Sequence, residues 1–318
     1  MSETDEVILE ARHITKTYPA PNHRILKVNN DISLKFYRGK TLGIIGESGC
    51  GKSTLMRVLM ALERPTEGQI LYRGQDVTKL KGEKLRCHRQ KIQMVFQDPS
   101  AAFSPRMRVM DIVCEPLLNF KRIRKRDKEE TARRLLQMVE LPGDFVWRYP
   151  HNMSGGERQR VGIARALALE PELVICDEAT SSLDVSVQKT VMELLARLQK
   201  EKQIAYGFVS HDIALVQAAA HQAAVMYSGN VVEILPGEKL GGSCLHPYTE
   251  ELADSAFDFK KDFRNFSPVV KRDSADDAVF LPGCPFQNRC SRCMEICRKK
   301  RPELKTVEKE HQVACHLY

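Results

Sequence analysis

The stretch Gly46-Glu47-Ser48-Gly49-Cys50-Gly51-Lys52-Ser53, followed by Thr54, decides the fold class of this chain of 318 residues. It matches the phosphate-loop pattern G-x-x-x-x-G-K-[ST]. The apolar run over residues 41–45 predicts a buried strand before the loop, and the apolar spacing from Thr54 to Leu62 predicts a helix after it. A strand, a glycine-rich loop and a helix in this order predict a P-loop unit.

The residue types in this loop suit a nucleotide phosphate and its metal ion. The glycines let the backbone curl until several N–H groups face one anion, and the following helix adds its positive end. Lys52 is placed to reach the β and γ phosphates, and the Ser53 hydroxyl can bind Mg²⁺. We therefore predict a nucleotide and Mg²⁺ site here, rather than a glycine-rich structural turn.

A pair of acidic residues lies at the end of another predicted strand. Asp177-Glu178 follows the apolar residues 173–176, where a parallel sheet delivers side chains to its ligand crevice. Asp177 would hold Mg²⁺, and Glu178 would position and polarise the attacking water. Helix capping is the alternative role for the pair, and the phosphate loop upstream favours the chemical role.

A second glycine loop, Ser154-Gly155-Gly156-Glu157, begins a predicted helix. Ser154 can cap that helix, and the glycines expose backbone N–H groups that suit an anion. One nucleotide does not need two helix N-termini so far apart in one chain. We therefore predict a head-to-tail pair of domains in which each loop serves the partner's ATP, with a plain capped helix as the alternative.

Strands alternating with helices along the rest of the chain predict a largely parallel sheet. The pattern from Val109 to about Leu141 predicts a helical insertion, and residues 222–227 and 230–235 predict a closing hairpin. Further strands are predicted over 7–14, 32–36, 69–72, 92–96 and 204–209, and helices over 154–168, 185–198 and 246–255. We expect a nucleotide-binding domain over 1–240, with its helical part over about 100–165, and a C-terminal extension over 241–318.

Charge and hydropathy narrow the class of partner. The net charge of +8, from 49 Lys and Arg against 41 Asp and Glu, suits nucleotide phosphates, nucleic acid or an anionic membrane face. No stretch approaches the roughly 18 consecutive apolar residues of a membrane span. The acidic start Met1–Glu10 lacks the basic and apolar blocks of a signal peptide. We expect a cytoplasmic chain, so that any membrane pore must come from another chain.

These motifs resemble the ATP-binding cassette (ABC) family over roughly Val7 to Leu235. Met153-Ser154-Gly155-Gly156-Glu157 resembles the family signature, although members often have Gln at Glu157 and Leu or Phe at Met153. The resemblance implies an α/β P-loop ABC ATPase fold: a RecA-like core, an antiparallel β subdomain, a helical subdomain and a small Cys-rich tail. It also implies roles for Tyr18 on adenine, Gln97 as a Mg²⁺ ligand facing the membrane partner, Asp184 in the D-loop Ser182-Leu183-Asp184, and His211 at the γ-phosphate.

A narrower resemblance is to the oligopeptide, dipeptide and nickel importer branch. It rests on Pro105-Arg106-Met107, on His246-Pro247-Tyr248-Thr249 and on the cysteine tail. In that branch two ATPase subunits commonly form a heterodimer under two membrane permease subunits, and an extracytoplasmic binding protein delivers the substrate. The resemblance thus implies a peripheral ATPase on the cytoplasmic face of the membrane, without a nucleic-acid partner. Tail and length favour peptide uptake over nickel.

Cysteines cluster at the C-terminal end of the chain. Of the ten cysteines, Cys284, Cys290, Cys293, Cys297 and Cys315 lie within one short segment. Clustered thiolates in a reducing compartment bind soft metals or iron–sulfur clusters. By resemblance to the importer branch, Cys284, Cys290, Cys297 and Cys315 would hold a [4Fe–4S] cluster, and Cys293 is a spare thiol or a competing ligand. A Zn²⁺ site and a tail packed by buried cysteines are the alternatives.

Other classes of function remain as alternatives at this point. An ABC ATPase linked to nucleic acid would suit the positive charge, but such proteins usually carry two cassettes or a long coiled-coil insertion, and the sequence has neither. A regulatory subunit that does not hydrolyse ATP would be expected to lack Glu178, Lys52 or His211, and all three are present. The sequence therefore favours a hydrolysing transport subunit.

Overall fold

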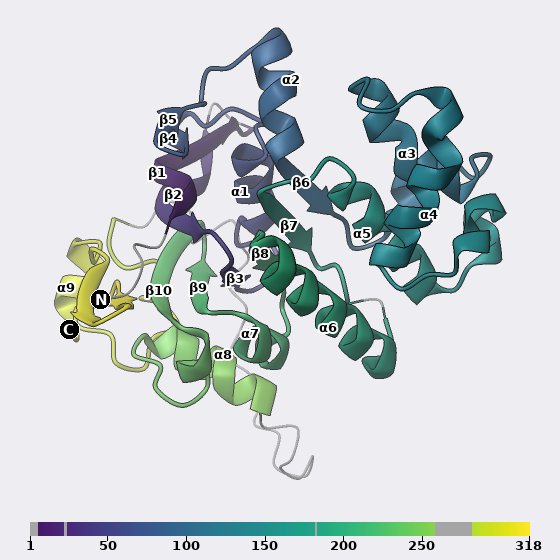
Figure 1. Ribbon diagram of the computed structural model, residues 1–318. Helices are drawn as coiled ribbons and strands as arrows, with labels where there is room; N and C mark the ends of the chain where they lie inside the picture. The colour runs from purple at the N-terminus through teal and green to yellow at the C-terminus, as the bar shows by residue number, and fades with distance from the viewer. Residues whose placement is uncertain (1–5, 22–23, 182, 258–281) are drawn as a thin grey trace. The chain divides into compact units, whose positions relative to one another are not determined.

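The computed structural model describes residues 6–21, 24–181, 183–257 and 282–318 (Figure 1). These residues form two compact units. The helical unit contains Tyr37–Lys40 and the described residues up to Ile8 and from Leu80 to Gly207. The phosphate-loop unit contains Leu9–Phe36, Thr41–Lys79 and the described residues from Phe208 to Tyr318. The segment of mixed aromatic and basic residues after Phe257 lies outside the described residues.

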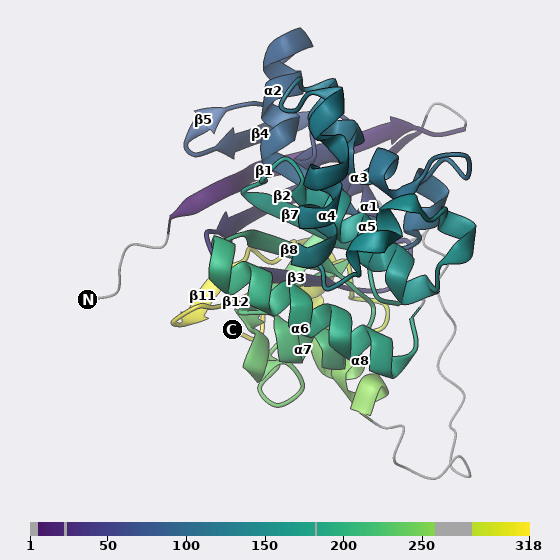
Figure 2. The ribbon, with the colours of Figure 1, turned by 45° about the vertical axis from the view of Figure 1, so that its right-hand side comes forward.

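The helical unit combines parallel strands with a group of helices. β6 pairs in parallel with β7, and β8 follows β7 in the order of the sheet. Helices α3, α4 and α5 lie side by side (Figures 1 and 2) and bury Val113, Leu136 and Val161 completely. The elements are α2 (Gly82–Lys91), β6 (Ile92–Val95), η1 (Pro99–Ala102), α3 (Val109–Asn119), η2 (Lys125–Asp127), α4 (Lys128–Met138), η3 (Gly143–Trp147), η4 (Pro150–Asn152), α5 (Gly155–Leu167), β7 (Leu173–Asp177), α6 (Val185–Lys202) and β8 (Ala205–Val209).

The phosphate-loop unit contains an antiparallel sheet and a mixed sheet. The antiparallel sheet has the order β2-β1-β4-β5, with a register shift in β1 between Arg12 and Thr15. In the mixed sheet β3 pairs in parallel with β9, and β9 pairs antiparallel with β10. The elements are β1 (Val7–Pro19), β2 (Ile25–Tyr37), β3 (Thr41–Ile45), α1 (Lys52–Leu59), β4 (Glu67–Tyr72), β5 (Gln75–Asp76), α7 (Ile213–Ala219), β9 (Gln222–Tyr227), β10 (Asn230–Pro236) and η5 (Gly237–Lys239).

The C-terminal extension is part of the phosphate-loop unit. It contains α8 (Pro247–Phe257), α9 (Glu295–Lys299), β11 (Lys305–Glu308) and β12 (His311–Val313). β12 pairs antiparallel with β10, and β11 pairs with β12, so that the yellow tail of Figure 1 continues the sheet beyond β10. One hydrophobic cluster contains Ile45 at the end of β3 together with Tyr248, Phe286 and Cys297. The extension therefore shares its core with the strand that leads into the phosphate loop.

Most predicted elements are confirmed. The strand, loop and helix around residues 41–59, the helical insertion, the helix after Ser154 and the hairpin of β9 and β10 all form. Six of the described α-helices and β-strands were not predicted from the sequence: α2, β5, α7, α9, β11 and β12. In α2 only His88 is buried, and every residue of β11 is exposed, so neither segment carries an apolar period.

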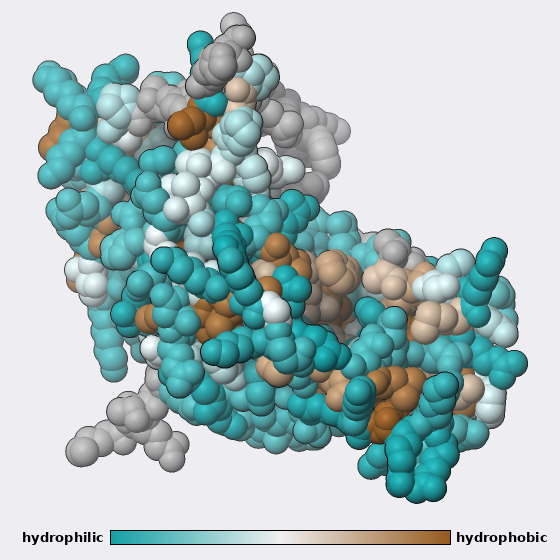
Figure 3. Space-filling model, turned by 90° about the horizontal axis from the view of Figure 1, so that it is seen from above, coloured by the Kyte–Doolittle hydropathy of each residue, from teal (hydrophilic) through white to brown (hydrophobic). Residues whose placement is uncertain are grey.

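The surface seen from above is mainly hydrophilic, and apolar patches interrupt it (Figure 3). Large apolar side chains that are exposed include Phe96, Trp147 and Ile296. Within the described ranges, no helix has both the length and the apolar character needed to cross a membrane.

A buried charge fastens the extension to the sheet. The Glu233 carboxylate on β10 is fully buried and hydrogen-bonds the ring of His311 on β12 at 2.7 Å. It also accepts the N–H groups of Leu245 and His246, at 2.8 and 3.0 Å, just before α8. One side chain thus joins β10, β12 and the start of α8.

Removing this carboxylate should weaken the fold strongly, because it leaves a buried imidazole and the N–H groups of Leu245 and His246 without their acceptor. We expect Glu233→Ala to lower the free energy of unfolding by about 3–5 kcal/mol, measured by denaturant unfolding. Glu308→Ala is the matched control, since Glu308 forms an exposed pair with Lys239, and it should change little. Equal stability of the two variants would contradict the role of Glu233.

Candidate functional site

The phosphate loop depends on glycine at positions where neighbouring backbone is very close. Gly49 and Gly51 have φ of 83° and 102°, values that side chains disfavour. A Cβ on Gly51 would lie 2.5 Å from the carbonyl oxygen of Val28 in β2. A Cβ on Gly46 would lie 2.2 Å from that of Met226 in β9. The loop is therefore shaped by the strands on either side of it.

The helix after the loop begins without a side-chain cap. Gly51 is the N-cap residue of α1 and has no side chain that could accept from the first N–H groups. Such a helix start attracts an anion, since its N–H groups and the helix dipole point toward the same place. The Lys52 ammonium group lies back on its own loop, donating to the carbonyl oxygens of Gly46 and Glu47 at 2.6 and 2.9 Å.

A contact from β2 to the loop was not predicted from the sequence. Asn29 on β2 is fully buried and donates from Nδ2 to the carbonyl oxygen of Gly51 at 3.0 Å. The Cys50 side chain is buried too, and this burial raises the pKa of its thiol. The sequence around Asn29 alternates polar and apolar residues without a distinctive pattern, so neither its burial nor its partner could be inferred.

His211 belongs to the same unit as the phosphate loop. The Ser210 N–H donates to the carbonyl oxygen of Ile44 in β3 at 3.2 Å, so His211 follows a residue that is fixed beside the strand leading to the loop. Asp212 then caps α7 by accepting the N–H of Leu215 at 3.0 Å. This geometry supports the position predicted for His211, while its role at a phosphate remains a prediction.

Tyr18 lies near the end of β1. Its hydroxyl donates to Glu63 at 2.5 Å, and Lys16 Nζ lies 4.9 Å from the centre of its ring. Burial, followed by the Glu63 carboxylate, raises the pKa of Tyr18. The hydroxyl and the ring thus both have protein partners in this structure.

In the helical unit, the acidic pair is linked to Gln97. Asp177 ends β7, and Glu178 follows with φ of 48°. A residue other than Gly in this conformation costs about 1 kcal/mol or more, and such strain is frequent at functional sites. The Ser181 hydroxyl donates to the Glu178 carbonyl oxygen at 2.9 Å and accepts from Gln97 at 3.2 Å. Ser181, missed in the sequence analysis, thus connects two predicted site residues.

The second glycine loop forms a capped helix start. Ser154 Oγ accepts the N–H of Glu157 at 3.3 Å, and the Glu157 carboxylate accepts the N–H of Ser154 at 2.7 Å. This capping box satisfies two N–H groups at the start of α5. A Cβ on Gly156 would lie 2.3 Å from a methyl group of Val187 in α6. Asp184 caps α6 in turn, accepting the N–H of Val187 at 3.0 Å, and Ser182 lies outside the described residues.

The cysteine cluster does not have the form of a metal centre. Cys284 and Cys297 belong to the hydrophobic cluster, and Cys290 and Cys293 pack against it. Burial raises the pKa of Cys284 to about 12, with smaller contributions from the neighbouring thiols. In the part of the chain that the structure describes, no group of three or more His, Cys, Asp or Glu side chains is arranged to hold a metal ion. The prediction of a metal site therefore gains no support from this arrangement.

Comparisons with known proteins agree with this architecture. Residues 29–181 match the family described as "ABC transporter", and residues 232–297 match "Oligopeptide/dipeptide transporter, C-terminal region". The oligopeptide transport ATP-binding protein AppF of Bacillus subtilis is 42% identical over 98% of each chain. Its counterpart OppF of Haemophilus influenzae is 37% identical over 99% of this chain and 98% of its own length. The dimeric structure of the ATP-binding cassette MJ0796 bound to ADP and Pi is 29% identical, with a TM-score of 0.65 over 72% of this chain and 98% of that chain.

A phosphate loop at an uncapped helix, between strands of an α/β sheet, defines a P-loop ATPase of mixed α/β class. Given the near-complete coverage of these relatives, the chain belongs to the ABC transporter family, in its oligopeptide/dipeptide branch.

The capping box at α5 should make the stability of the folded state depend on pH. The hydrogen bond from the Ser154 N–H holds the pKa of Glu157 below its ordinary value. The ionised carboxylate therefore stabilises the folded state above its unfolded pKa of about 4.3, and this contribution is lost as the pH falls through the lower folded value. Denaturant unfolding between about pH 6 and pH 3 should show the advantage of the wild type over Glu157→Gln shrinking with falling pH. Parallel pH profiles for the two proteins would contradict this account.

Proposed function

We propose that this chain is the ATP-binding and ATP-hydrolysing subunit of an ABC importer for di- and oligopeptides. The observation that carries the proposal is the combination of the phosphate loop with a C-terminal extension of the oligopeptide/dipeptide type in one chain. The relatives AppF and OppF, named as oligopeptide transport ATP-binding proteins, match this chain over nearly their whole length. Nickel import is the alternative within the same branch.

Each predicted site residue has a proposed part in hydrolysis. The phosphate loop binds the triphosphate through backbone N–H groups, while Lys52 and a Mg²⁺ ion, held by Ser53, Gln97 and Asp177, neutralise developing charge. Glu178 orients the attacking water, and His211 contacts the γ-phosphate. Tyr18 stacks on the adenine. The linkage from Gln97 through Ser181 to Glu178 supports a coupling between the metal-sensing residue and the residue that acts on water.

Two cassettes close head to tail over two ATP molecules in this proposal. The Ser154-Gly155-Gly156 loop of one chain faces the γ-phosphate bound to the other, and Asp184 lies at the contact between the cassettes. The dimeric form of MJ0796 supports this arrangement. Loss of the γ-phosphate then lets the dimer open. The dimer thus has an open and a closed state, and ATP shifts the equilibrium toward the closed one. The partner ATPase is a second, similar subunit.

A groove in the helical unit suits a membrane partner. It has a volume of about 570 Å³ and is lined by apolar and charged side chains, among them Phe96, Phe103, Phe120, Arg89, Glu115 and Arg165. Phe96 is 45% exposed and directly precedes Gln97. We propose that this groove receives a segment of a permease subunit on the cytoplasmic face of the membrane, so that movement of the Gln97 segment is passed to the pore.

The function is tested with the complete transporter, reconstituted in lipid vesicles with its binding protein. We expect di- or oligopeptides to stimulate ATP hydrolysis and to enter the vesicles, and Ni²⁺ to do neither. Uptake of Ni²⁺ and not of peptides would show that nickel is the substrate.

Glu178→Gln should retain ATP binding and trap a closed dimer, while kcat falls about 10²-fold or more, because water is no longer polarised. Hydrolysis at the wild-type rate in Glu178→Gln would show that this residue has no part in the chemical step.

The cysteine tail is the subject of a separate proposal. We propose that Cys284, Cys290, Cys297 and Cys315 bind a [4Fe–4S] cluster, with Zn²⁺ as the competing metal. The grouping of these thiols in one small extension supports it, since Cys284 and Cys297 share the hydrophobic cluster against which Cys290 packs. The arrangement of the described side chains does not itself form a metal site, so the metal has to be measured.

Anaerobic purification with metal analysis and an absorption spectrum tests this proposal. We expect about four iron atoms per chain, with Cys290→Ser losing the iron and Cys293→Ser keeping it. Stoichiometric zinc without iron would assign the site to Zn²⁺. A chain without either metal would leave the thiols as packing residues of the tail.

A further inference from the structure

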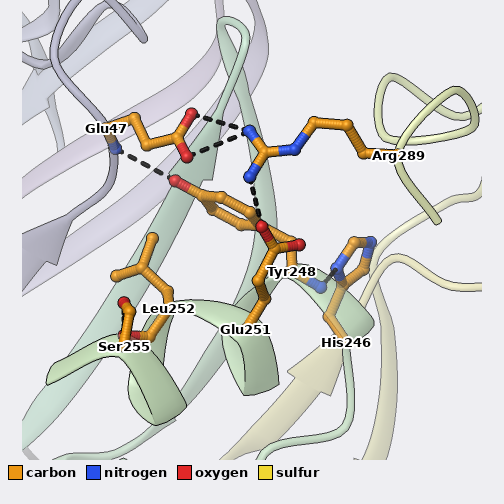
Figure 4. A network of polar contacts seen from close by, with 7 residues as sticks. All are labelled: Glu47, His246, Tyr248, Glu251, Leu252, Ser255 and Arg289. Atoms are coloured by element: carbon orange, nitrogen blue, oxygen red, sulfur yellow. Dashed lines mark hydrogen bonds and ion pairs between the residues drawn. The ribbon is translucent and has the colours of Figure 1, made fainter. Parts of the chain in front are cut away.

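The C-terminal extension makes direct contact with the phosphate loop (Figure 4). Glu47 is the second residue of that loop, and its N–H donates to the hydroxyl of Tyr248 at 3.0 Å. Arg289 Nη1 donates to both carboxylate oxygens of Glu47 at 3.0 Å. Arg289 Nη2 donates to Glu251 of α8 at 2.5 Å. One guanidinium group therefore ties the loop to α8.

Contacts other than the one with Glu47 also fix the position of Arg289. It lies on a tight turn in which the N–H groups of Arg289 and Cys290 donate to the carbonyl oxygen of Phe286 at 3.1 and 3.0 Å. Phe286 is 2% exposed and packs against the rings of Tyr227 and Tyr248, with centroids 5.2 and 5.5 Å apart. The Arg289 guanidinium lies 5.4 Å from the Phe286 ring centre. A cation held this way loses little further freedom on pairing with a carboxylate.

The extension reaches the other end of the loop as well. Arg301 donates from Nη2 to the carbonyl oxygen of Asn30 in β2 at 2.9 Å. The neighbouring residue, Asn29, donates to Gly51 at the start of α1. Contacts from the extension thus act at Glu47 and, through β2, near Gly51, so both ends of the loop are connected to it.

We propose that Arg289 is a positioning residue for ATP binding. It neutralises Glu47, whose free carboxylate would repel a triphosphate bound to the same loop, and it holds the first turn of the loop against α8. A loop that is already ordered loses less conformational entropy when it binds its ligand. Arg289 therefore acts on the affinity for ATP and leaves the chemical step largely unchanged.

The extension offers a matched control for this inference. Arg292 forms an ion pair with Glu250 of α8, so it too joins the tail to that helix. Both arginines pair with neighbouring carboxylates on α8, and Arg289 in addition donates to the Glu47 carboxylate of the loop. A variant at Arg292 loosens the tail in a similar way, and it separates general loosening from the effect on the loop.

The experiment measures Kd for Mg–ATP and kcat on the full chain with its partner ATPase, with thermal unfolding to verify folding. We expect Arg289→Ala to raise Kd about tenfold, equivalent to about 1.4 kcal/mol, with kcat within about twofold of the wild type. Arg292→Ala should leave both values unchanged. Unchanged Kd in Arg289→Ala, or equal shifts in both variants, would overturn the inference. A wild-type chain that binds no ATP would instead contradict the proposed function.

A double-mutant cycle with Glu47→Gln tests the pair directly. In the Glu47→Gln background, Arg289→Ala should raise Kd less than about threefold, because the carboxylate that Arg289 neutralises is absent. A tenfold rise in both backgrounds would show that Arg289 acts without Glu47. If Arg289→Ala does not fold, Arg289→Lys, which keeps the charge on a single ammonium group, should raise Kd by an intermediate factor, and wild-type affinity in that variant would count against the inference.

Discussion

The backbone of the phosphate loop can curl as it does only because glycine stands where neighbouring strands leave no room for a side chain. At Gly46 and Gly51 the obstacle is a main-chain carbonyl group, of Met226 in β9 and of Val28 in β2. Such a clash cannot be relieved by a change of rotamer, so a larger residue would have to displace a strand. The conformation of the loop is thus set jointly by its own glycines and by the sheets that enclose it.

The C-terminal extension contributes to the same constraint. Ile45, the last residue of β3, shares a hydrophobic cluster with Tyr248, Phe286 and Cys297. Glu233 fixes the extension to β10 from inside that core, and Arg289 fixes it to the loop at the surface. The extension is therefore a structural part of the phosphate-loop unit, since it shares a hydrophobic core with β3 and contacts the loop itself.

The helix starts of the chain differ in a way that suits their proposed roles. α1 follows a glycine and has no side-chain cap, which leaves its first N–H groups to a bound phosphate. The starts of α5 and α6 are closed by Ser154 and Asp184. The capping box at α5 uses the N–H groups of Ser154 and Glu157. In the proposed dimer, the partner's phosphate would therefore be bound by the remaining N–H groups of this helix start.

The residues of local motifs were predictable because their geometry is encoded in a few neighbouring positions. The glycines and Lys52 of the loop, the apolar strand before Asp177, and the cap at Ser154 each follow from backbone conformation, burial or capping within one short segment. The same reasoning failed for α2, in which His88 is the one buried residue, and for β11, whose residues are all exposed, because neither segment carries an apolar period. Asn29, Ser181, Glu233 and Arg289 could not be assigned their partners either. Glu47 and Arg289 are 242 positions apart in the chain, and a contact of that kind exists only once the core has brought distant segments together, because side-chain pairing across the fold leaves no periodic signal in the sequence.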